Sequence, residues 1–375
     1  GIFSLDEFYD LQVSGETSKI LDVFRYINTA AVPEVSGGPA YGYFTGGGPG
    51  AVSTVDRIDY SNDTATAAPK GPLSRTTKAH GATGSRTHGY AAGGNPGPKS
   101  TIDRLDYSSD TSTASARGPL TATSNYVSGV GNNDFGYFTT GGNSNSSVDR
   151  VDYSNDSPTA TTKGSLVSSN WDRAATGTQS FGYFAGGYPE ISTTIERIDY
   201  SNDTATATQK GNLAYAPIAH GMAATGNASF GYFAGGRSPG DSPSMDGNTI
   251  VNRLDYSNDT SNAVLKGNLS EKRGGMGATG SSSFGYFASA FKPADTSNID
   301  RIDYSNDTAT ASPKGYLTAA KQYVAGYSGQ ANALGPIPGV PIVPATRTET
   351  GTTAPAGTNY GYFGGGLGGS PFLSS

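Results

Sequence analysis

The chain contains no cysteine, a single tryptophan and three histidines among its 375 residues. Without cysteine there is no disulfide framework and no thiolate chemistry, so the fold must depend on packing alone. The histidines, His80, His88 and His220, are isolated, and a zinc site without cysteine would need at least two of them together with carboxylates. The sequence therefore predicts no zinc site and no cofactor.

Blocks of lysine and arginine are also missing, and the formal net charge is −6. Because nucleic-acid binding needs clustered cations, we expect no nucleic acid as a partner. No apolar run approaches the roughly 20 residues of a membrane helix, so no membrane insertion is expected. The first ten residues, GIFSLDEFYD, are acidic and have no basic segment, and we therefore expect no secretory signal peptide.

What the sequence has in abundance is glycine, with 54 residues, and one repeated stretch. The stretch Phe181–Thr208, FGYFAGGYPEISTTIERIDYSNDTATAT, recurs in close copies along the chain. The glycine of its GY core returns at steps of 47, 47, 46, 49, 54 and 76 residues. These glycines are Gly42, Gly89, Gly136, Gly182, Gly231, Gly285 and Gly361. The spacing indicates a tandem-repeat architecture.

Six copies of the repeat fill residues 29–317, and each divides into four short strand patterns. The first is small and glycine-rich, as in HGATGS at 80–85, and the second is the aromatic run GYF ending in two glycines. The third carries D-R-[IVL]-D-Y, and a turn, S-N-D-T, leads to a fourth that ends in K-G-x-L or a near match. Four short strands with a period in the forties are typical of a β-propeller blade. We therefore predict an all-β propeller with six full blades.

These motifs resemble those of the kelch-repeat β-propellers. The shared features are the diglycine that closes the second strand, a tyrosine on the third and a tight acidic turn after it. The resemblance covers all six copies and implies four-stranded blades around one axis. It departs at one position, because the kelch family has a fourth-strand tryptophan seven residues after the tyrosine where this chain has alanine. The alanines are Ala67, Ala114, Ala160, Ala207, Ala263 and Ala311. We expect the GYF aromatics and a recurrent arginine to fill the space between blades.

The repeat also resembles structural proteins of marine, cyanophage-type bacteriophages, in which GYF-GG and DRIDYSND units occur in tandem. That resemblance implies a virion protein that is assembled in the host cytoplasm and carried on the particle.

Each third strand carries an arginine two residues before an aspartate, so both side chains lie on one face of the strand. A guanidinium held there can bridge neighbouring blades through charge-assisted hydrogen bonds, or line a channel for an anionic ligand. Because the arginine is identical in every copy, we favour the structural role. The arginines are Arg57, Arg104, Arg150, Arg197, Arg253 and Arg301, and the aspartates are Asp59, Asp106, Asp152, Asp199, Asp255 and Asp303.

Other motifs give weaker signals for chemistry. In the S-N-D-T turn, Asn62 and Asp63 offer oxygen ligands, but these residues favour turns through their own backbone hydrogen bonds, and calcium needs six to eight oxygens. The glycine run at 45–50 lacks the helix and lysine of a phosphate loop. No nucleophile elbow is present. The sequence therefore predicts no metal site and no enzyme.

Both ends of the chain fall outside the six copies. Residues 1–28 are predicted to be a helical attachment or plug segment that begins with a capping box, Ser4 and Glu7. Residues 318–359 are rich in proline and glycine, which predicts an extended arm or long loop. Residues 360–375 contain YGYFGGG, a partial seventh repeat, and then a C-terminal tail. This extra second strand favours seven blades over six.

The copies differ mainly in their loops, where propellers usually carry their binding function. The candidate loop contacts are Tyr188, Arg237, Asp241, Phe291 and Lys292. Two functions remain open. The first is a bacteriophage virion structural protein, a rigid propeller displayed at the neck, tail or fibre in several copies and anchored to other virion proteins through its non-repeat ends. The second is a lectin-like propeller whose variable loops bind a host surface glycan.

Overall fold

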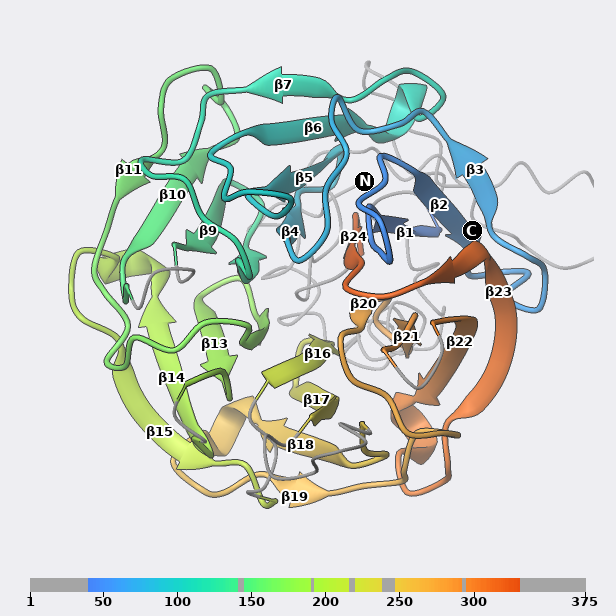
Figure 1. Cartoon of the computed structure of the whole chain (residues 1–375). Helices are drawn as coiled ribbons and strands as arrows, with labels where there is room; N and C mark the ends of the chain where they lie inside the picture. The colour runs from blue at the N-terminus through green and yellow to red at the C-terminus, as the bar shows by residue number, and fades with distance from the viewer. Residues whose placement is uncertain are drawn as a thin grey trace, which may run out of the picture. The chain divides into compact units, whose positions relative to one another are not determined.

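The computed structural model describes residues 40–140, 145–189, 192–215, 220–237, 247–291 and 295–330. These residues form six four-stranded antiparallel sheets, arranged as blades around one axis (Figure 1). The prediction of an all-β propeller with four-stranded blades is therefore confirmed. In the part of the chain that the structure describes, no helix is long and apolar enough to cross a membrane.

Each blade runs from an innermost strand beside the axis to an outermost strand at the rim. In that order, blade 1 consists of β24 (Ala325–Ser328), β1 (Tyr41–Thr45), β2 (Val55–Asp59) and β3 (Ala68–Lys70). Blade 2 consists of β4 (Gly81–Gly84), β5 (His88–Ala92), β6 (Ile102–Asp106) and β7 (Ser115–Arg117). Blade 3 consists of β8 (Gly129–Gly131), β9 (Phe135–Thr139), β10 (Val148–Asp152) and β11 (Thr161–Thr162).

Blade 4 consists of β12 (Ala174–Gly177), β13 (Phe181–Ala185), β14 (Thr194–Asp199) and β15 (Thr208–Asn212). Blade 5 consists of β16 (His220–Gly226), β17 (Phe230–Arg237), β18 (Val251–Asp255) and β19 (Val264–Leu265). Blade 6 consists of β20 (Gly277–Gly280), β21 (Phe284–Ala288), β22 (Thr296–Asp303) and β23 (Ser312–Lys321). Short 3₁₀ turns follow the third strands of four blades: η1 (Tyr107–Ser109), η3 (Tyr200–Asn202), η4 (Tyr256–Asn258) and η5 (Tyr304–Asn306).

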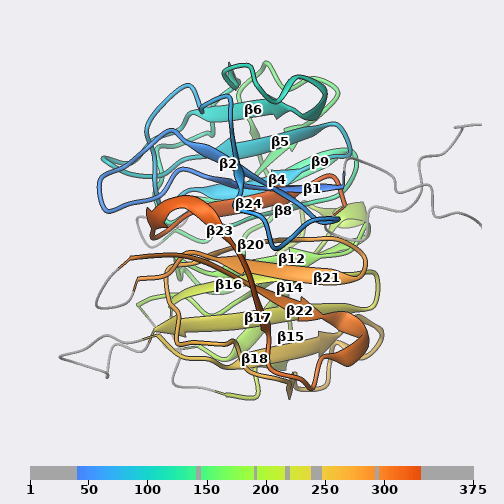
Figure 2. The ribbon, with the colours of Figure 1, turned by 90° about the vertical axis from the view of Figure 1, so that its right-hand side faces the viewer.

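The antiparallel strands give the propeller two different faces, and Figure 2 shows the strands running between them. One face carries the loops from the second strand to the third, such as 46–54, and the connections from one blade to the next, such as 71–80. The other carries the tight turns from the first strand to the second, such as 85–87, and the S-N-D-T turns, such as 60–67. We call them the loop face and the turn face.

The hydrophobic core lies between the blades in six separate clusters. Consecutive residues of a strand point to opposite faces of the sheet, so Tyr183 of the GYF motif packs against blade 5 and Phe184 against blade 3. Each GYF tyrosine stacks on the tyrosine that directly follows the third strand of the next blade, with ring centroids 4.6–5.0 Å apart. These rings fill the space that the small alanines leave between blades.

The aspartate of each S-N-D-T turn joins two blades. Asp259 of blade 5 accepts hydrogen bonds from Arg197 Nη1 at 2.7 Å and from the Tyr183 hydroxyl at 3.0 Å, both from blade 4. Lys210 Nζ of blade 4 lies 3.3 Å from its other oxygen. The same cluster recurs at every junction, with Arg117 in place of lysine at one of them. The turn aspartates are Asp63, Asp110, Asp156, Asp203, Asp259 and Asp307.

The D-R arginines therefore lie between blades rather than along the channel, and their hydrogen-bonded partner is the turn aspartate of the next blade. The aspartate two residues after each arginine has a different role. Asp199, for example, accepts hydrogen bonds from the backbone N–H and the hydroxyl of Ser201 at 2.9 and 2.7 Å, which fixes the turn of its own blade. The spacing of two residues along a strand predicts that the arginine and this aspartate share a face of the sheet. It does not predict which residue of another blade bonds to the arginine.

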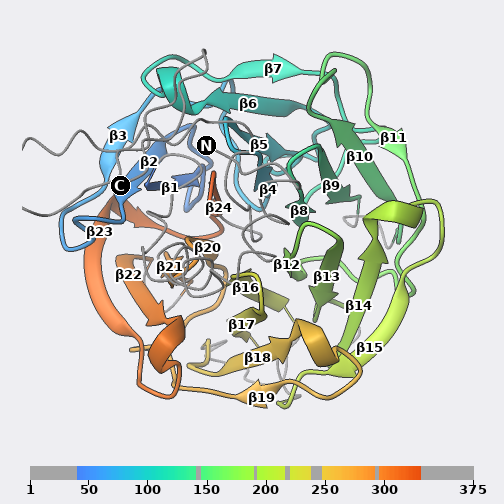
Figure 3. The ribbon, with the colours of Figure 1, turned by 180° about the vertical axis from the view of Figure 1, so that it is seen from behind.

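The ring closes through a strand from the far end of the chain. β24 pairs with β1, with Gly42 opposite Ser328, and so supplies the innermost strand of blade 1. Blade 6 contacts blade 1 directly, because Arg301 Nη1 lies 2.6 Å from Asp63 Oδ2. Figure 3 shows the innermost strands β4, β8, β12, β16, β20 and β24 around the centre, seen from behind. Six blades thus complete the ring, and the seven-bladed arrangement is not confirmed.

The predicted segment boundaries differ from the structure at the C-terminal side of blade 6. β23 extends to Lys321 and β24 ends at Ser328, so the first part of the predicted arm at 318–359 belongs to the propeller. The predicted N-terminal helices in 1–28 and the partial repeat in 360–375 lie outside the described residues.

Candidate functional site

A ring of six residues surrounds the channel at the loop face, and we call it the collar. Each collar residue lies at or just before the start of an innermost strand. Its backbone N–H donates to the carbonyl oxygen of the collar residue in the neighbouring blade, at 2.7–3.4 Å, so the bonds form a closed circle. The collar residues are Ala79, Tyr126, Asp172, Gly221, Gly275 and Tyr323.

All six collar residues have a left-handed backbone, with φ between 51° and 72°. Glycine adopts this conformation easily, but a residue with a side chain incurs a strain of about 1–3 kcal/mol. The circle of hydrogen bonds holds Tyr126, Asp172 and Tyr323 in it. Backbone strain of this kind gathers at ligand sites, where the surrounding structure fixes a side chain in a set direction.

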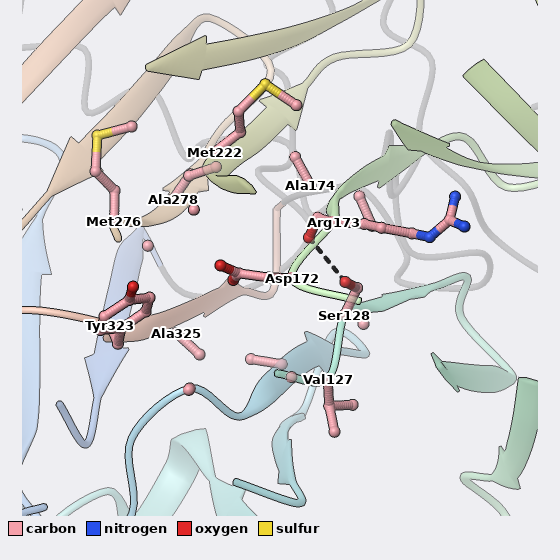
Figure 4. A pocket seen from close by; sticks show the side chains of 18 of the residues that line it. Val127, Ser128, Asp172, Arg173, Ala174, Met222, Met276, Ala278, Tyr323 and Ala325 are labelled. Atoms are coloured by element: carbon pink, nitrogen blue, oxygen red, sulfur yellow. Dashed lines mark hydrogen bonds between the residues drawn. The ribbon is translucent and has the colours of Figure 1, made fainter. Parts of the chain in front are cut away.

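Side chains of the collar and of the residues below it line a cavity of about 90 Å³. Figure 4 shows the Asp172 carboxylate projecting toward the middle of the ring, whereas Arg173 turns away from it. Met222 and Met276 lie on the side of the glycine collar positions. A cavity of this size holds only a few water molecules. We call the opening of the channel at the collar the mouth, and a larger ligand would lie across this mouth rather than inside the channel.

Four aromatic side chains form a continuous run across this mouth, and we call them the aromatic run. Ring centroids are 4.9 Å apart for Tyr188 and Trp171, 4.5 Å for Trp171 and Tyr126, and 5.8 Å for Tyr126 and Tyr323. Trp171 and Tyr188 are also joined by two backbone hydrogen bonds of 2.8 Å. Tyr188 is 36% exposed, and the other three residues are partly buried.

The guanidinium of Arg237 continues the aromatic run beyond Tyr323. The Arg237 guanidinium donates a hydrogen bond to the Tyr323 hydroxyl and lies over the Phe291 ring, 5.0 Å from its centroid. The backbone N–H of Phe291 donates to Gly274 O at 2.6 Å, which fixes that ring beside the mouth. Of the five predicted loop contacts, Arg237 and Phe291 therefore contact each other at one end of the aromatic run, and Tyr188 lies at its other end. The other two, Asp241 and Lys292, lie outside the described residues.

The sequence did not single out Tyr126, Asp172 or Tyr323. A signal for them does exist. At the collar position the other three copies have alanine or glycine, so a large or charged residue there is an exception within an otherwise regular repeat. Residues that break the repeat, rather than those that define it, mark the site.

The tyrosine hydroxyls at the mouth are protonated, and burial is the main cause that raises their pKa values. Burial raises the pKa of Tyr126, the charge of Asp172 raises it further, and Arg237 opposes the shift. Burial and Asp172 raise the pKa of Tyr323 in the same way. Both hydroxyls therefore remain neutral hydrogen-bonding groups at physiological pH.

His80 lies beneath the collar and stays uncharged. Its side chain is buried and its Nε2 lies 2.9 Å from Thr45 Oγ1. Burial, helped by the charge of Arg75, lowers the pKa of His80 to about 3. His80 is therefore a neutral, packed side chain beneath the collar.

The site offers aromatic rings together with a carboxylate and a guanidinium, groups that can contact a ligand through stacking and hydrogen bonds. Among the described residues, no three histidine, aspartate or glutamate side chains gather as metal ligands would.

Comparison with known proteins finds no family model and no curated protein that matches the chain. The four-stranded blades are consistent with a kelch-like repeat at the level of the fold.

Proposed function

We propose that this protein is a recognition component of a bacteriophage particle, a rigid propeller that is attached through its two ends and presents its loop face to a partner outside the particle. The observation behind the proposal is that the two faces of the propeller differ. The chain enters and leaves it at the turn face, and the non-repeated aromatic side chains lie at the loop face.

The position of the two ends follows from the register of blade 1. Gly42 near the start of β1 lies opposite Ser328 at the end of β24, and the Ser328 hydroxyl donates to Tyr41 O at 3.1 Å. The backbone N–H of Tyr60, at the S-N-D-T turn, donates to Ala40 O at 3.0 Å. Both points where the chain joins the propeller are therefore at the turn face. Neither end is needed to complete a blade, which leaves both available for attachment.

The junctions between blades support a display role. Each turn aspartate has three donors from the preceding blade, and the ring is closed by the pairing of β24 with β1. Buried, paired charges of this kind hold elements in one arrangement. A rigid body of this kind suits a component that must keep its loop face pointing outward.

The proposal is tested first by mass spectrometry of purified particles. We expect the full chain at an integral copy number, and we expect a chain that lacks residues 1–28 to fold but not to be incorporated. Circular dichroism of the isolated truncated chain checks that it folds. If the protein is absent from particles, or if the truncated chain is incorporated normally, attachment through the N-terminal end is wrong.

A further inference from the structure

Apart from the collar itself, the residues around the mouth occupy two equivalent positions in each blade. One directly follows the diglycine position and holds Tyr188, Arg237 and Phe291 in blades 4, 5 and 6. The other directly precedes the collar and holds Trp171 in blade 4. The matching residues of blade 2 are Asn95 and Lys78, which pair through the same kind of backbone bridge as Tyr188 and Trp171. Aromatic or cationic side chains therefore stand at these positions in blades 4, 5 and 6, and the cation Lys78 stands at one of them in blade 2.

The scaffold does not require these aromatic rings. The collar circle closes through Ala79, Gly221 and Gly275 as well as through the two tyrosines, so the backbone ring forms without an aromatic side chain. The pair of positions in blade 2 forms its bridge with Lys78 and Asn95. Rings placed at the exposed rim where smaller or polar residues suffice are typical of a contact surface.

The chemistry of the mouth matches a sugar chain. The rings of a saccharide present C–H groups that stack on aromatic faces, and their hydroxyl groups bond to carboxylates, guanidinium groups and amides. The aromatic run supplies apolar ring surface, most of it at the exposed Tyr188, and Asp172, Arg237 and Asn125 supply the polar groups beside it. Because four rings lie side by side, with successive centroids 4.5–5.8 Å apart, their combined surface extends over more than one sugar residue. The run therefore favours a short linear oligosaccharide over a single sugar.

We infer that the loop-face mouth binds a linear oligosaccharide, which lies along Tyr188, Trp171, Tyr126 and Tyr323 with its hydroxyl groups toward Asp172 and Arg237. This inference rests on the proposed function, because it takes the loop face as the one that meets a partner. The narrow cavity below the collar keeps the sugar chain across the mouth.

The test measures binding of the full chain to an array of bacterial surface oligosaccharides, with monosaccharides and unstructured peptides on the same array. We expect binding to at least one oligosaccharide, and Trp171→Ala and Tyr188→Ala to weaken it roughly tenfold each. Trp171→Phe keeps an aromatic face and should retain most of the affinity. Tyr316→Ala is the matched control, since Tyr316 is 52% exposed on the outer strand β23, and it should leave binding unchanged.

Thermal melting of each variant separates loss of the site from loss of the fold. Binding only to peptides, no binding to any oligosaccharide, or equal binding by wild type and Trp171→Ala would overturn the inference. Incorporation into particles is measured in parallel with the same variants and should not change. Normal incorporation without sugar binding contradicts the inference alone, whereas sugar binding by a chain that is absent from particles contradicts the proposed function alone.

Discussion

Asp259 and its five counterparts show how single residues hold this ring together. The Asp259 side chain is 8% exposed, and a carboxylate so deep in the protein is stable only when donors surround it. The three donors come from one neighbouring blade, and two of them, the D-R arginine and the GYF tyrosine, recur at all six junctions. The recurrent residues of the repeat are therefore explained by contacts between blades.

The first prediction concerns the arginine of this cluster. Arg197→Ala removes the shortest of the three bonds and leaves Asp259 with Tyr183 and Lys210. We expect the free energy of unfolding to fall by about 2 kcal/mol, because the carboxylate stays buried with a donor missing. Urea titration measures the change, with the exposed Lys272→Ala as control. An unchanged unfolding midpoint for Arg197→Ala would contradict the structural role of the D-R arginines.

The second prediction concerns an exception in blade 2. In the other five blades the D-R arginine lies over an aromatic ring at the start of the second strand, with the guanidinium carbon 3.9–4.3 Å from the ring centroid. In blade 2 that residue is His88, and burial together with Arg104 lowers the pKa of its imidazole. We expect His88→Phe to stabilise the protein by about 0.5–1 kcal/mol, measured by urea titration at neutral pH. A loss of stability would show that the ring beneath the arginine has no such effect.

The third prediction concerns pH and follows from His80. Its pKa of about 3 in the fold lies below the value of about 6.5 in an unfolded chain, so unfolding takes up a proton in this range. The contribution is complete above about pH 6.5 and is lost as the pH falls toward 3. Between pH 7 and pH 5 we expect His80→Gln to lose less stability than wild type, by roughly 2 kcal/mol. Identical pH dependence of the two unfolding free energies would contradict the neutral state of His80.

Among the elements, β24 is the strand that sequence patterns did not reveal. Its residues, Ala325–Ser328, lack the small Gly-Ala-Thr-Gly pattern of the other innermost strands, because Tyr327 stands where four of them have threonine. That ring fits the junction of blades 1 and 2, where Ala91 replaces the phenylalanine of the GYF motif and Gly89 leaves room beside it. The sequence feature that indicates ring closure is therefore a pair of compensating departures from the repeat, Ala91 and Tyr327, which lie far apart in the chain.

The fourth prediction uses this compensation. Ala91→Phe places a second ring in space that Tyr327 fills, and Tyr327→Thr empties that space, so each change alone should destabilise the protein by about 1–3 kcal/mol. The double variant restores the arrangement of the other junctions and should be more stable than the sum of the two changes predicts, by at least about 1 kcal/mol. Urea titration of the wild type, the two single variants and the double variant gives the four unfolding free energies of this double-mutant cycle. Simple additivity would show that the two residues do not share this space.

At the scale of the whole molecule, the repeat was sufficient to predict the class of fold, the blades and their four strands. It was not sufficient to count the blades, since YGYFGGG at 360–366 matches a second strand in sequence and lies outside the described residues. The site was predictable only in part. Tyr188, Arg237 and Phe291 could be predicted as contacts because their loops differ from the matching loops of other copies. The collar, which places Tyr126 between Trp171 and Tyr323, forms only when the ring has closed.

Closure also creates the polarity on which the proposed function depends. Because β24 returns to β1, both junctions with the non-repeat ends fall at the turn face, while the collar and the aromatic run lie at the opposite face. The chain has no cysteine, so one introduced cysteine gives a unique point for labelling on either face.

The most direct test of this polarity compares two such labels on intact particles. Gly50→Cys lies in an exposed loop of the loop face with no neighbouring atom within 4 Å of an added side chain, and Ser180→Cys lies at an exposed position of the turn face. Both isolated proteins should react with a maleimide reagent at similar rates. On particles we expect the Gly50→Cys thiol to remain reactive and the Ser180→Cys thiol to be protected, whereas the opposite pattern would contradict attachment through the turn face.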